Sequence, residues 1–357
     1  MARLSTRKKI AFTFAITLLL VAAFEGLARL YFWARSTRQV EDAVVDRFHP
    51  MRFDLAPGRT LPANGASAHI NNFGLRGPDV EIPKTRTRIL CLGDSATFGY
   101  APDVTDSATY PARLGAILEA AHPGKYEVLN GGRPSFSTLD CLGFFSYRAA
   151  ELKPDIVVLM IGWNDTHLAH PLQRPPAKIA PNVLASSALL KMATLVVGRF
   201  VEFRSPTSSN LRSQLARLPK PTDNLSADVF ARDERGLGDL ARLCIAHGAR
   251  PILVRLASPV RDEWTDVASL SDEEVRVMMP HLIGGELSPG GWARFVREAN
   301  ASVDRVGRKL GLIVVDPAEL RHPAQFVDVC HPNAKGNEVL ARTIAIAIEH
   351  ASKTVER

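Results

Sequence analysis

The sequence is poor in several patterns that would place it in a specialised class of protein. Its 357 residues include only four cysteines, and none of them has the spacing of a metal-ligand set. Aromatic residues make up 7% of the chain, and no dense lysine and arginine patch is interleaved with them, so nucleic-acid binding has little support. Internal repeats and low-complexity tracts are lacking too. The composition that remains is that of an ordinary globular protein.

The cysteines also lack a pattern that would define a disulfide framework. They are scattered at Cys91, Cys141, Cys244 and Cys330. In an oxidising compartment, cysteines in this number can pair in three ways, and the sequence does not choose among them. Cys91 and Cys244 lie in apolar periodic segments, which favours buried free thiols.

One long apolar run is present, and it follows a basic N-terminal tip. The tip covers residues 1–9 and carries four of the positive charges behind the formal net charge of +7. The run continues past Glu25 and Arg29, which have helical i,i+4 spacing, to an aromatic cluster that ends at Trp33. This pattern fits either a cleaved signal peptide or a retained transmembrane signal anchor over 10–34. The length of the run and its aromatic end favour the anchor, with the tip in the cytoplasm and the rest of the chain outside.

The remaining chain divides into a lead-in and an α/β domain. Residues 35–84 are rich in Pro, Gly, Asn and Arg and are predicted to form a tether, which includes the turn-like run Asn71-Asn72-Phe73-Gly74-Leu75-Arg76-Gly77. Residues 85–357 alternate between apolar strand-like runs and amphipathic helical segments, which predicts a doubly wound parallel sheet. The segment 166–229 interrupts this alternation. It is either a helical insertion that covers a site or a helix on the sheet followed by a linker.

Apolar runs and helical spacing give approximate positions for the elements of this domain. The predicted strands are 89–92, 126–129, 156–161, 252–256 and 312–315. The predicted helices are 110–121, 230–244, 292–310 and 333–350.

Three residues from opposite ends of the domain form a candidate nucleophilic site. Ser95 follows the first predicted strand, in the run Gly93-Asp94-Ser95, and open α/β sheets hold their ligands at the carboxyl ends of strands. His331 lies three residues after Asp328. A carboxylate at that spacing can accept the Nδ1–H of the imidazole and leave Nε2 to take a proton from a hydroxyl. The combination predicts a serine nucleophile, a histidine base and an aspartate that orients the base.

A fourth candidate follows the most apolar strand, 156–161. There the sequence reads Gly162-Trp163-Asn164-Asp165, next to the strand that we expect to carry Ser95. Acyl transfer needs hydrogen-bond donors for a developing oxyanion, and the side-chain amide of Asn164 is one candidate donor. The alternative is a simple turn that ends the strand.

Together these runs resemble the sequence blocks of the SGNH (GDSL) hydrolase family in order and location. The resemblance covers the chain from about Thr87 to the C-terminus. The blocks are Gly93-Asp94-Ser95, Asn130 to Ser137, Gly162-x-Asn164-Asp165 and Asp328-x-x-His331-Pro332. The resemblance implies a three-layer α/β/α flavodoxin-like fold with a five-stranded parallel sheet. It also implies a Ser-His-Asp ester hydrolase without a cofactor or metal, in which the backbone N–H of Ser95 and the Asn164 side chain are oxyanion donors.

The second block departs from the pattern of this family. Its asparagine is usually followed, five places on, by a glycine whose backbone N–H is the third oxyanion donor. Here Ser135 stands five places after Asn130. The resemblance therefore implies the Ser135 N–H as third donor if its backbone conformation does not require glycine, with Gly132 as the alternative donor.

The N-terminal part is predicted to be an anchor, then a lead-in that contains Asn72-Phe73-Gly74-Leu75-Arg76-Gly77, then the strand that ends in Gly93-Asp94-Ser95. This order resembles that of bacterial envelope members of the family, several of which act on O-acylated polysaccharides or lipids. This predicts an esterase or deacetylase tethered to the bacterial inner membrane, with its domain facing the periplasm or the exterior. An O-acyltransferase that delivers the acyl group to a sugar hydroxyl would use the same residues. A non-catalytic envelope-binding module is a third reading, and the presence of Ser95, Asp328 and His331 disfavours it. The expected partners are an ester substrate and the membrane; the oligomeric state stays open.

Overall fold

The computed structural model describes residues 6–36, 44–45, 54–165, 223, 225–284 and 287–355. The chain divides into two compact units. One contains residues 1–42 and 174–211, and the other contains residues 43–173 and 212–357. Most of the predicted insertion at 166–229 lies outside the described residues.

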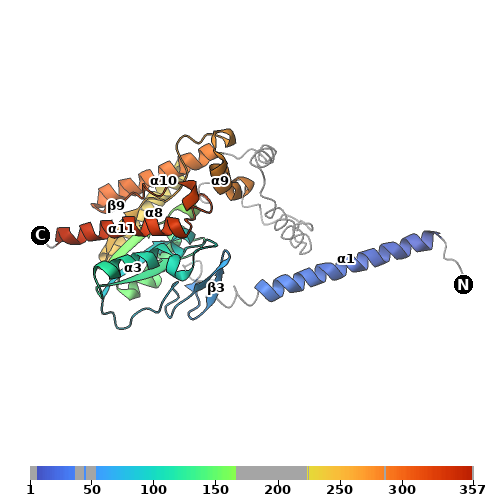
Figure 1. The fold of residues 1–357 in the computed structure, drawn as a ribbon, viewed down its shortest axis with the longest axis horizontal. Helices are drawn as coiled ribbons and strands as arrows, with labels where there is room; N and C mark the ends of the chain where they lie inside the picture. The colour runs from blue at the N-terminus through green and yellow to red at the C-terminus, as the bar shows by residue number, and fades with distance from the viewer. Residues whose placement is uncertain are drawn as a thin grey trace. The chain divides into compact units, whose positions relative to one another are not determined.

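Helix α1 spans Thr6–Ser36 and covers the predicted signal anchor (Figure 1). Nε of Arg29 donates to Oε1 of Glu25 over 2.8 Å, the ion pair that their i,i+4 spacing predicts. In the part of the chain that the structure describes, no helix has both the length and the apolarity that crossing a membrane requires. The prediction of a transmembrane anchor over 10–34, and with it a membrane partner, is therefore not supported.

The second unit is built on a five-stranded parallel sheet with strand order β6-β5-β7-β8-β9. Numbered along the sheet's own chain order, this is the flavodoxin-like arrangement 2-1-3-4-5. All five predicted strands are present, so this part of the prediction is confirmed. Their bounds are β5 Thr87–Gly93, β6 Tyr126–Gly132, β7 Ile156–Met160, β8 Arg250–Val254 and β9 Ile313–Val315.

Helices cover both faces of the sheet and bury its strands. Helices α3 (Tyr110–Ala121) and α11 (Ala334–Val355) pack against each other, as Figure 1 shows. Helix α8 (Ala227–Ala246) packs against both α4 (Thr138–Tyr147) and α10 (Pro289–Leu310). In β5, Leu90 and Leu92 belong to the core cluster that includes residues of α4 and α8, and the alternate residues take the other face. A strand buried on both faces reads as a continuous apolar run, which is why the strands were predictable.

Residues 54–84 are part of this unit and do not form a tether. They contain the strand β2 (Asp54–Leu55), which pairs with β1 (Val44–Val45), and the hairpin of β3 (Thr60–Ala63) with β4 (Ala66–His69). Four apolar side chains of this segment form a core cluster with Phe98, which follows Ser95 by three residues. The predicted domain boundary at residue 85 therefore falls too late. Strands of two to four residues are too short to show the periodicity that prediction uses.

Candidate active site

A tight turn presents Ser95 where strand β5 ends. A Cβ atom at Gly93 would lie 2.2 Å from a carbonyl oxygen of β7, so glycine is needed at this close approach. Asp94 then caps the four-residue helix α2 (Ser95–Phe98) by accepting a backbone N–H two residues further on. Gly99 ends the helix at a φ of 87°, in the left-handed region that glycine tolerates. Ser95 is therefore the first residue of a helix at the carboxyl edge of the sheet.

The loop between β9 and α11 brings His331 and Asp328 to this serine. Nε2 of His331 lies 2.8 Å from Oγ of Ser95. Nδ1 of His331 lies 2.7 Å from Oδ2 of Asp328, and Oδ1 of Asp328 accepts the backbone N–H groups of Cys330 and His331, both over 2.9 Å. The Asp328 carboxylate thus stabilises the conformation of its own loop with one oxygen and orients the imidazole of His331 with the other. All three residues of the predicted nucleophilic site are brought together.

Burial and charge act in opposite directions on the pKa values of this pair. Burial favours the neutral carboxyl of Asp328, but the His331 ring and its hydrogen bond outweigh burial and hold the Asp328 pKa well below its usual range. Burial also favours neutral His331, and the Asp328 carboxylate outweighs it, so the His331 pKa is raised. The arrangement therefore stabilises an imidazolium beside an aspartate that stays ionised.

Asp94 is a second buried carboxyl beside the serine. It is fully buried, and its Oδ2 atom makes no hydrogen bond with the described residues. Burial raises the pKa of Asp94 to about 6. The charge of Asp94 in turn contributes to the raised pKa of His331. The ionisation of Asp94 therefore affects the base as well as the local fold.

Asn164 lies at the same edge of the sheet as Ser95, where the carboxyl ends of the strands meet, as predicted. It belongs to a 3-10 turn that follows β7, and β7 pairs with β5. Its Nδ2 donates to the carbonyl oxygen of Phe136 over 2.9 Å, next to Ser135. An amide nitrogen carries two hydrogens, so this bond leaves a second donor on the same atom. The bond to Phe136 fixes the orientation of the Asn164 side chain.

Ser135 has the backbone conformation that the family's glycine would favour, with a φ of 66°. A non-glycine residue in this left-handed region is strained by roughly 1 kcal/mol or more. Gly132, the alternative donor, lies at the end of β6 and gives its N–H to Oδ1 of Asn130 over 3.0 Å. A Cβ atom at Gly132 would lie 2.2 Å from the backbone of Phe98, so its glycine serves close packing. These facts favour Ser135 over Gly132 as a candidate donor.

Two residues beside Asp328 were missed by sequence reasoning. His281 lies on α9 (Asp272–Gly284), with Nε2 4.0 Å from Oδ2 of Asp328, and packs its ring edge-on against Trp292. Sγ of Cys330 lies 3.4 Å from Oδ1 of Asp328. The ligand atoms of His281, Asp328 and Cys330 lie within 4.8 Å of one another, so these residues could hold a metal ion. The expectation that the reaction needs no metal stays a prediction. A lone histidine on an amphipathic helix gave no signal in the sequence.

A buried carboxyl pair lies directly behind Asn164. Oγ1 of Thr138 lies 2.9 Å from Oδ2 of Asp165 and 2.7 Å from Oδ1 of Asp233. Burial raises the pKa of Asp165 well above its usual range, and the neighbouring Asp233 raises it further. Burial also raises the pKa of Asp233, to about 6. The residue after the candidate oxyanion donor is therefore held by a protonation-dependent contact.

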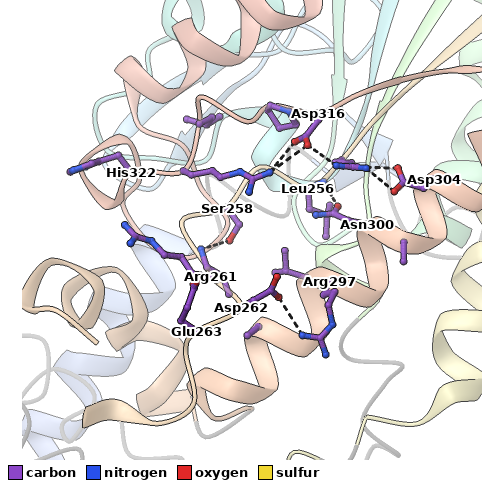
Figure 2. Close-up of a pocket in the computed structure, with 18 residues that line it drawn as sticks. Leu256, Ser258, Arg261, Asp262, Glu263, Arg297, Asn300, Asp304, Asp316 and His322 are labelled. Carbon is purple, nitrogen blue, oxygen red and sulfur yellow. Dashed lines mark hydrogen bonds and ion pairs between the residues drawn. The ribbon is translucent and has the colours of Figure 1, made fainter. Parts of the chain in front are cut away.

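A hollow of about 700 Å³ lies at the carboxyl ends of β8 and β9, and neither Ser95 nor His331 lines it. Figure 2 shows Arg297 of this hollow paired with Asp262 of the same lining. Arg261 instead pairs with Glu274, which lies 3.4 Å away and outside the lining. Arg255 bonds Asp304 over 2.7 Å and Asp316 over 2.6 Å. Because its arginines are paired within the chain, this hollow gives no indication of the ligand that it would take.

All four cysteines are described, and they carry buried free thiols, as the apolar setting of Cys91 and Cys244 predicted. Burial raises the pKa of Cys244 to about 12 and raises that of Cys141 well above its usual range. These two thiols are therefore neutral at ordinary pH.

Comparison with known proteins identifies the family. The model of the GDSL-like lipase/acylhydrolase family matches residues 91–339, well over half of the chain. The chain therefore belongs to this family and is an enzyme of the type that hydrolyses ester bonds. A search of curated proteins found no match.

Solved structures with a similar fold include three from bacterial or metagenomic sources. The α/β hydrolase LAE5 from the Lake Arreo metagenome has 17% identity and a TM-score of 0.43, covering 73% of this chain and 94% of its own. A putative lipolytic protein of the G-D-S-L family from Desulfitobacterium hafniense has 14% identity and a TM-score of 0.41, covering 73% and 99%. The acetylxylan esterase Axe2 from Geobacillus stearothermophilus has 16% identity and a TM-score of 0.44, covering 73% and 94%.

Proposed function

We propose that this member of the GDSL-like lipase/acylhydrolase family is a serine esterase or deacetylase that works through an acyl-enzyme. Ser95 is the nucleophile, His331 the general base and Asp328 the residue that orients the base. The observation that carries the proposal is the pair of short contacts from Ser95 Oγ to His331 Nε2, at 2.8 Å, and from His331 Nδ1 to Asp328 Oδ2, at 2.7 Å. The first distance is within the reach that proton transfer requires, and the second is within the hydrogen-bond reach by which Asp328 orients the base.

In the first half of the reaction, Oγ of Ser95 attacks the acyl carbon of the ester while its proton passes to Nε2 of His331. The imidazolium formed is stabilised by the ionised Asp328. The carbonyl oxygen takes the negative charge, and the donors for it are the backbone N–H groups of Ser95 and Ser135 and Nδ2 of Asn164. His331 then gives its proton to the leaving alcohol, and the acyl group remains on Ser95.

In the second half, a water molecule attacks the acyl-enzyme. His331 takes one proton from the water, the same donors stabilise the second oxyanion, and the proton returns to Oγ of Ser95 as the acid leaves. The enzyme is restored, and the sum of the two halves is ester plus water giving alcohol plus acid.

We propose as substrate an O-acylated carbohydrate or lipid met outside the cytoplasm. The support for this substrate class is the resemblance of the run at residues 72–77, ahead of Gly93-Asp94-Ser95, to the sequence of envelope members of the family. The support for the location is the basic tip ahead of the long apolar run. Fusion of a reporter that is active only after export, placed behind residue 357 of the full chain, tests the location; an inactive reporter in a stably made fusion contradicts it.

The activity is tested with the full chain and its Ser95→Ala variant. Both are treated with a fluorophosphonate probe and then with p-nitrophenyl esters of acetate and longer acids. We expect labelling and hydrolysis in the wild type, and neither in the variant. Labelling without hydrolysis in water would contradict the hydrolase and call for sugar hydroxyls as acyl acceptors. A folded wild type that is neither labelled nor active would contradict a catalytic role altogether.

A further inference from the structure

The side chain of Arg76, in the turn-like run at residues 71–77, is completely buried, and its guanidinium donates hydrogen bonds to several backbone carbonyl groups. Its side chain has 0% exposure. A buried guanidinium is tolerated only where its donors find partners, because an unpaired buried charge is strongly destabilising. Its hydrogen bonds run to the carbonyl oxygens of Phe98 (2.9 Å), Gly99 (2.8 Å) and Val104 (2.8 Å) and to Oδ1 of Asp106 (2.7 Å).

Two of these acceptors belong to the short helix that begins with the candidate nucleophile. Phe98 is the last residue of α2 and Gly99 is its cap. Within this turn, the carbonyl oxygen of Ser95 accepts the N–H groups of Gly99 and Tyr100, both over 3.0 Å, and that of Asp94 accepts the N–H of Phe98 over 2.9 Å.

The carbonyl groups at the end of a helix have no partner within it. Nδ2 of Asn130 reaches the carbonyl oxygen of Phe98 over 3.3 Å and the N–H of Ala101 reaches that of Gly99 over 3.0 Å. Arg76 makes the shortest bond to each and is the one group that bonds both, so it holds together the end of the helix whose start is Ser95.

The turn-like run at residues 71–77 is also contacted by an arginine from the loop that carries Ser135. Arg133 is fully buried, and its Nη2 donates to Oδ1 of Asp54 over 2.7 Å and to the carbonyl oxygen of Gly74 over 3.1 Å. Its guanidinium lies 3.9 Å from the centre of the Phe144 ring. The segment 54–77 is therefore tied to two of the three segments from which the oxyanion donors would come, those of Ser95 and Ser135.

Hydrogen bonds of the Asn71 side chain hold the backbone of the turn-like run at residues 71–77. Oδ1 of Asn71 accepts the backbone N–H groups of Phe73 and Leu75, both over 2.9 Å, and its Nδ2 donates to the carbonyl oxygen of Pro78. The side chain of Leu75 is completely buried in the main core. Asn71 thus holds the backbone on which Arg76 is mounted.

We infer that Arg76 is a positioning residue for the reaction: it holds the Ser95 turn in the geometry that acyl transfer needs, without touching the substrate. The segment that we predicted as a tether then completes the active site. The inference rests on the proposed function, since it assigns Arg76 to that same site. A misplacement of about 1 Å at an active site lowers the rate by about 100-fold, so a small shift of this turn is measurable.

Arg88 offers a matched control, because it is a buried arginine of the same kind at the other end of β5. Its guanidinium donates to Oε2 of Glu127 and to the carbonyl oxygens of Leu152 and Glu81, each over 2.6 Å. Replacement by lysine keeps the charge but cannot bond several spread acceptors at once. Arg76→Lys and Arg88→Lys should therefore lose similar stability, and only the first should affect the Ser95 turn.

The first experiment compares kcat and KM for p-nitrophenyl acetate in the full-length wild type, Arg76→Lys and Arg88→Lys, at a temperature where all three are folded by circular dichroism. We expect kcat to fall by roughly 10- to 100-fold in Arg76→Lys, with KM within about twofold of the wild type. Arg88→Lys should keep kcat within about twofold. Equal kcat values in the two variants would show that Arg76 is merely structural and would overturn the inference.

A second measurement does not depend on catalysis. Amide hydrogen exchange, followed by mass spectrometry, reports the stability of the turn through the N–H groups of Gly99 and Tyr100. We expect faster exchange in peptides that cover residues 95–104 for Arg76→Lys and unchanged exchange there for Arg88→Lys. If Arg76→Lys does not fold, Asp106→Asn, which removes the negative charge that pairs with Arg76, should show the same change in smaller degree. Unchanged exchange would overturn the inference.

The two measurements separate this inference from the proposed function. A wild type without labelling or hydrolysis would contradict the esterase, while the exchange data would still decide whether Arg76 holds the Ser95 turn. An active wild type with unaltered kcat and exchange in Arg76→Lys would leave the esterase intact and remove Arg76 from it.

Discussion

Nε2 of His331 lies 2.8 Å from Oγ of Ser95, although 236 positions separate the two residues in the chain. This contact requires the whole parallel sheet, because Ser95 follows β5 near its middle and His331 follows β9 at its edge. The carboxylate of Asp328 folds the loop that makes the contact possible, by accepting two backbone N–H groups of that loop. Fold and candidate chemistry therefore depend on the same hydrogen bonds.

Asn164→Ala should lower kcat by about 100-fold or more, because it removes one donor to the oxyanion. The Asn164 side chain also donates to the carbonyl oxygen of Phe136, so some loss of stability is expected as well. Steady-state kinetics with p-nitrophenyl acetate, at a temperature well below the unfolding transition, measure the catalytic part. An unchanged kcat would remove Asn164 from the set of donors.

The pH profile of kcat/KM should fall on the acid side with a midpoint above 6.5, the ordinary value for histidine. His331 must be neutral to accept the proton of Ser95, and Asp328 raises its pKa, so protonation removes the base at a higher pH than usual. In Asp328→Asn the midpoint should move to lower pH, with a large fall in kcat. A profile that is the same in both enzymes would contradict the assignment of Asp328.

The raised pKa of His331 also makes the stability of the folded protein depend on pH. The pKa of His331 is higher in the folded than in the unfolded chain, so the folded state binds the proton more tightly. This contribution is fully present below the unfolded pKa of about 6.5 and is lost as the pH rises through the folded value. His331→Gln should therefore flatten that part of the curve of unfolding free energy against pH.

Much of the fold could be predicted because the sheet is buried on both faces. Continuous apolar runs mark strands such as Ile156–Met160, and helix α3 was predicted with its observed bounds. The contacts of His331 with Ser95 and with Asp328 could be predicted from motifs whose residue types suit one chemistry. Helix α4 was missed, although a capping box of Ser137 with Asp140 marks its start and could have revealed it.

The segment 54–84 could not be predicted, because its structure comes from tertiary contacts. Arg76 and Arg133 look like ordinary charged residues in the sequence, and only their burial shows that they clamp carbonyl groups of distant loops. The left-handed conformation of Ser135 was equally hidden, since serine seldom adopts it. His281 reaches Asp328 only through the packing of α9.

Ser135→Gly should raise the free energy of unfolding or leave it unchanged, in contrast to most serine-to-glycine changes. Glycine relieves the strain of the left-handed conformation, roughly 1 kcal/mol, and this offsets the greater backbone freedom of glycine in the unfolded chain. Ser146→Gly, inside helix α4, is the control and should lose about 0.5 kcal/mol. Urea unfolding compares the two. A loss at Ser135 as large as that at Ser146 would argue against strain there.

Asp233→Asn should make the stability of the protein less sensitive to a rise in pH above about 4. The single proton of the Thr138 hydroxyl cannot be donated to both Asp165 and Asp233, which lie 2.9 and 2.7 Å away, so one carboxyl must be protonated to complete the contact. Burial raises the pKa of Asp233 to about 6, above the unfolded value, so the folded state binds the extra proton. Stability is therefore lost as the pH rises from about 4 through 6.

Asparagine at position 233 offers a permanent N–H donor to the Thr138 hydroxyl, whatever the pH. The unfolding free energy of the variant, measured in urea at pH 5 and pH 8, should therefore differ less between the two conditions than that of the wild type. Asp239→Asn, an exposed position on the same helix, is the control for a general change in charge and should keep the wild-type difference. If Asp233→Asn also keeps it, the proton is held elsewhere, and Asp165 becomes the group to replace.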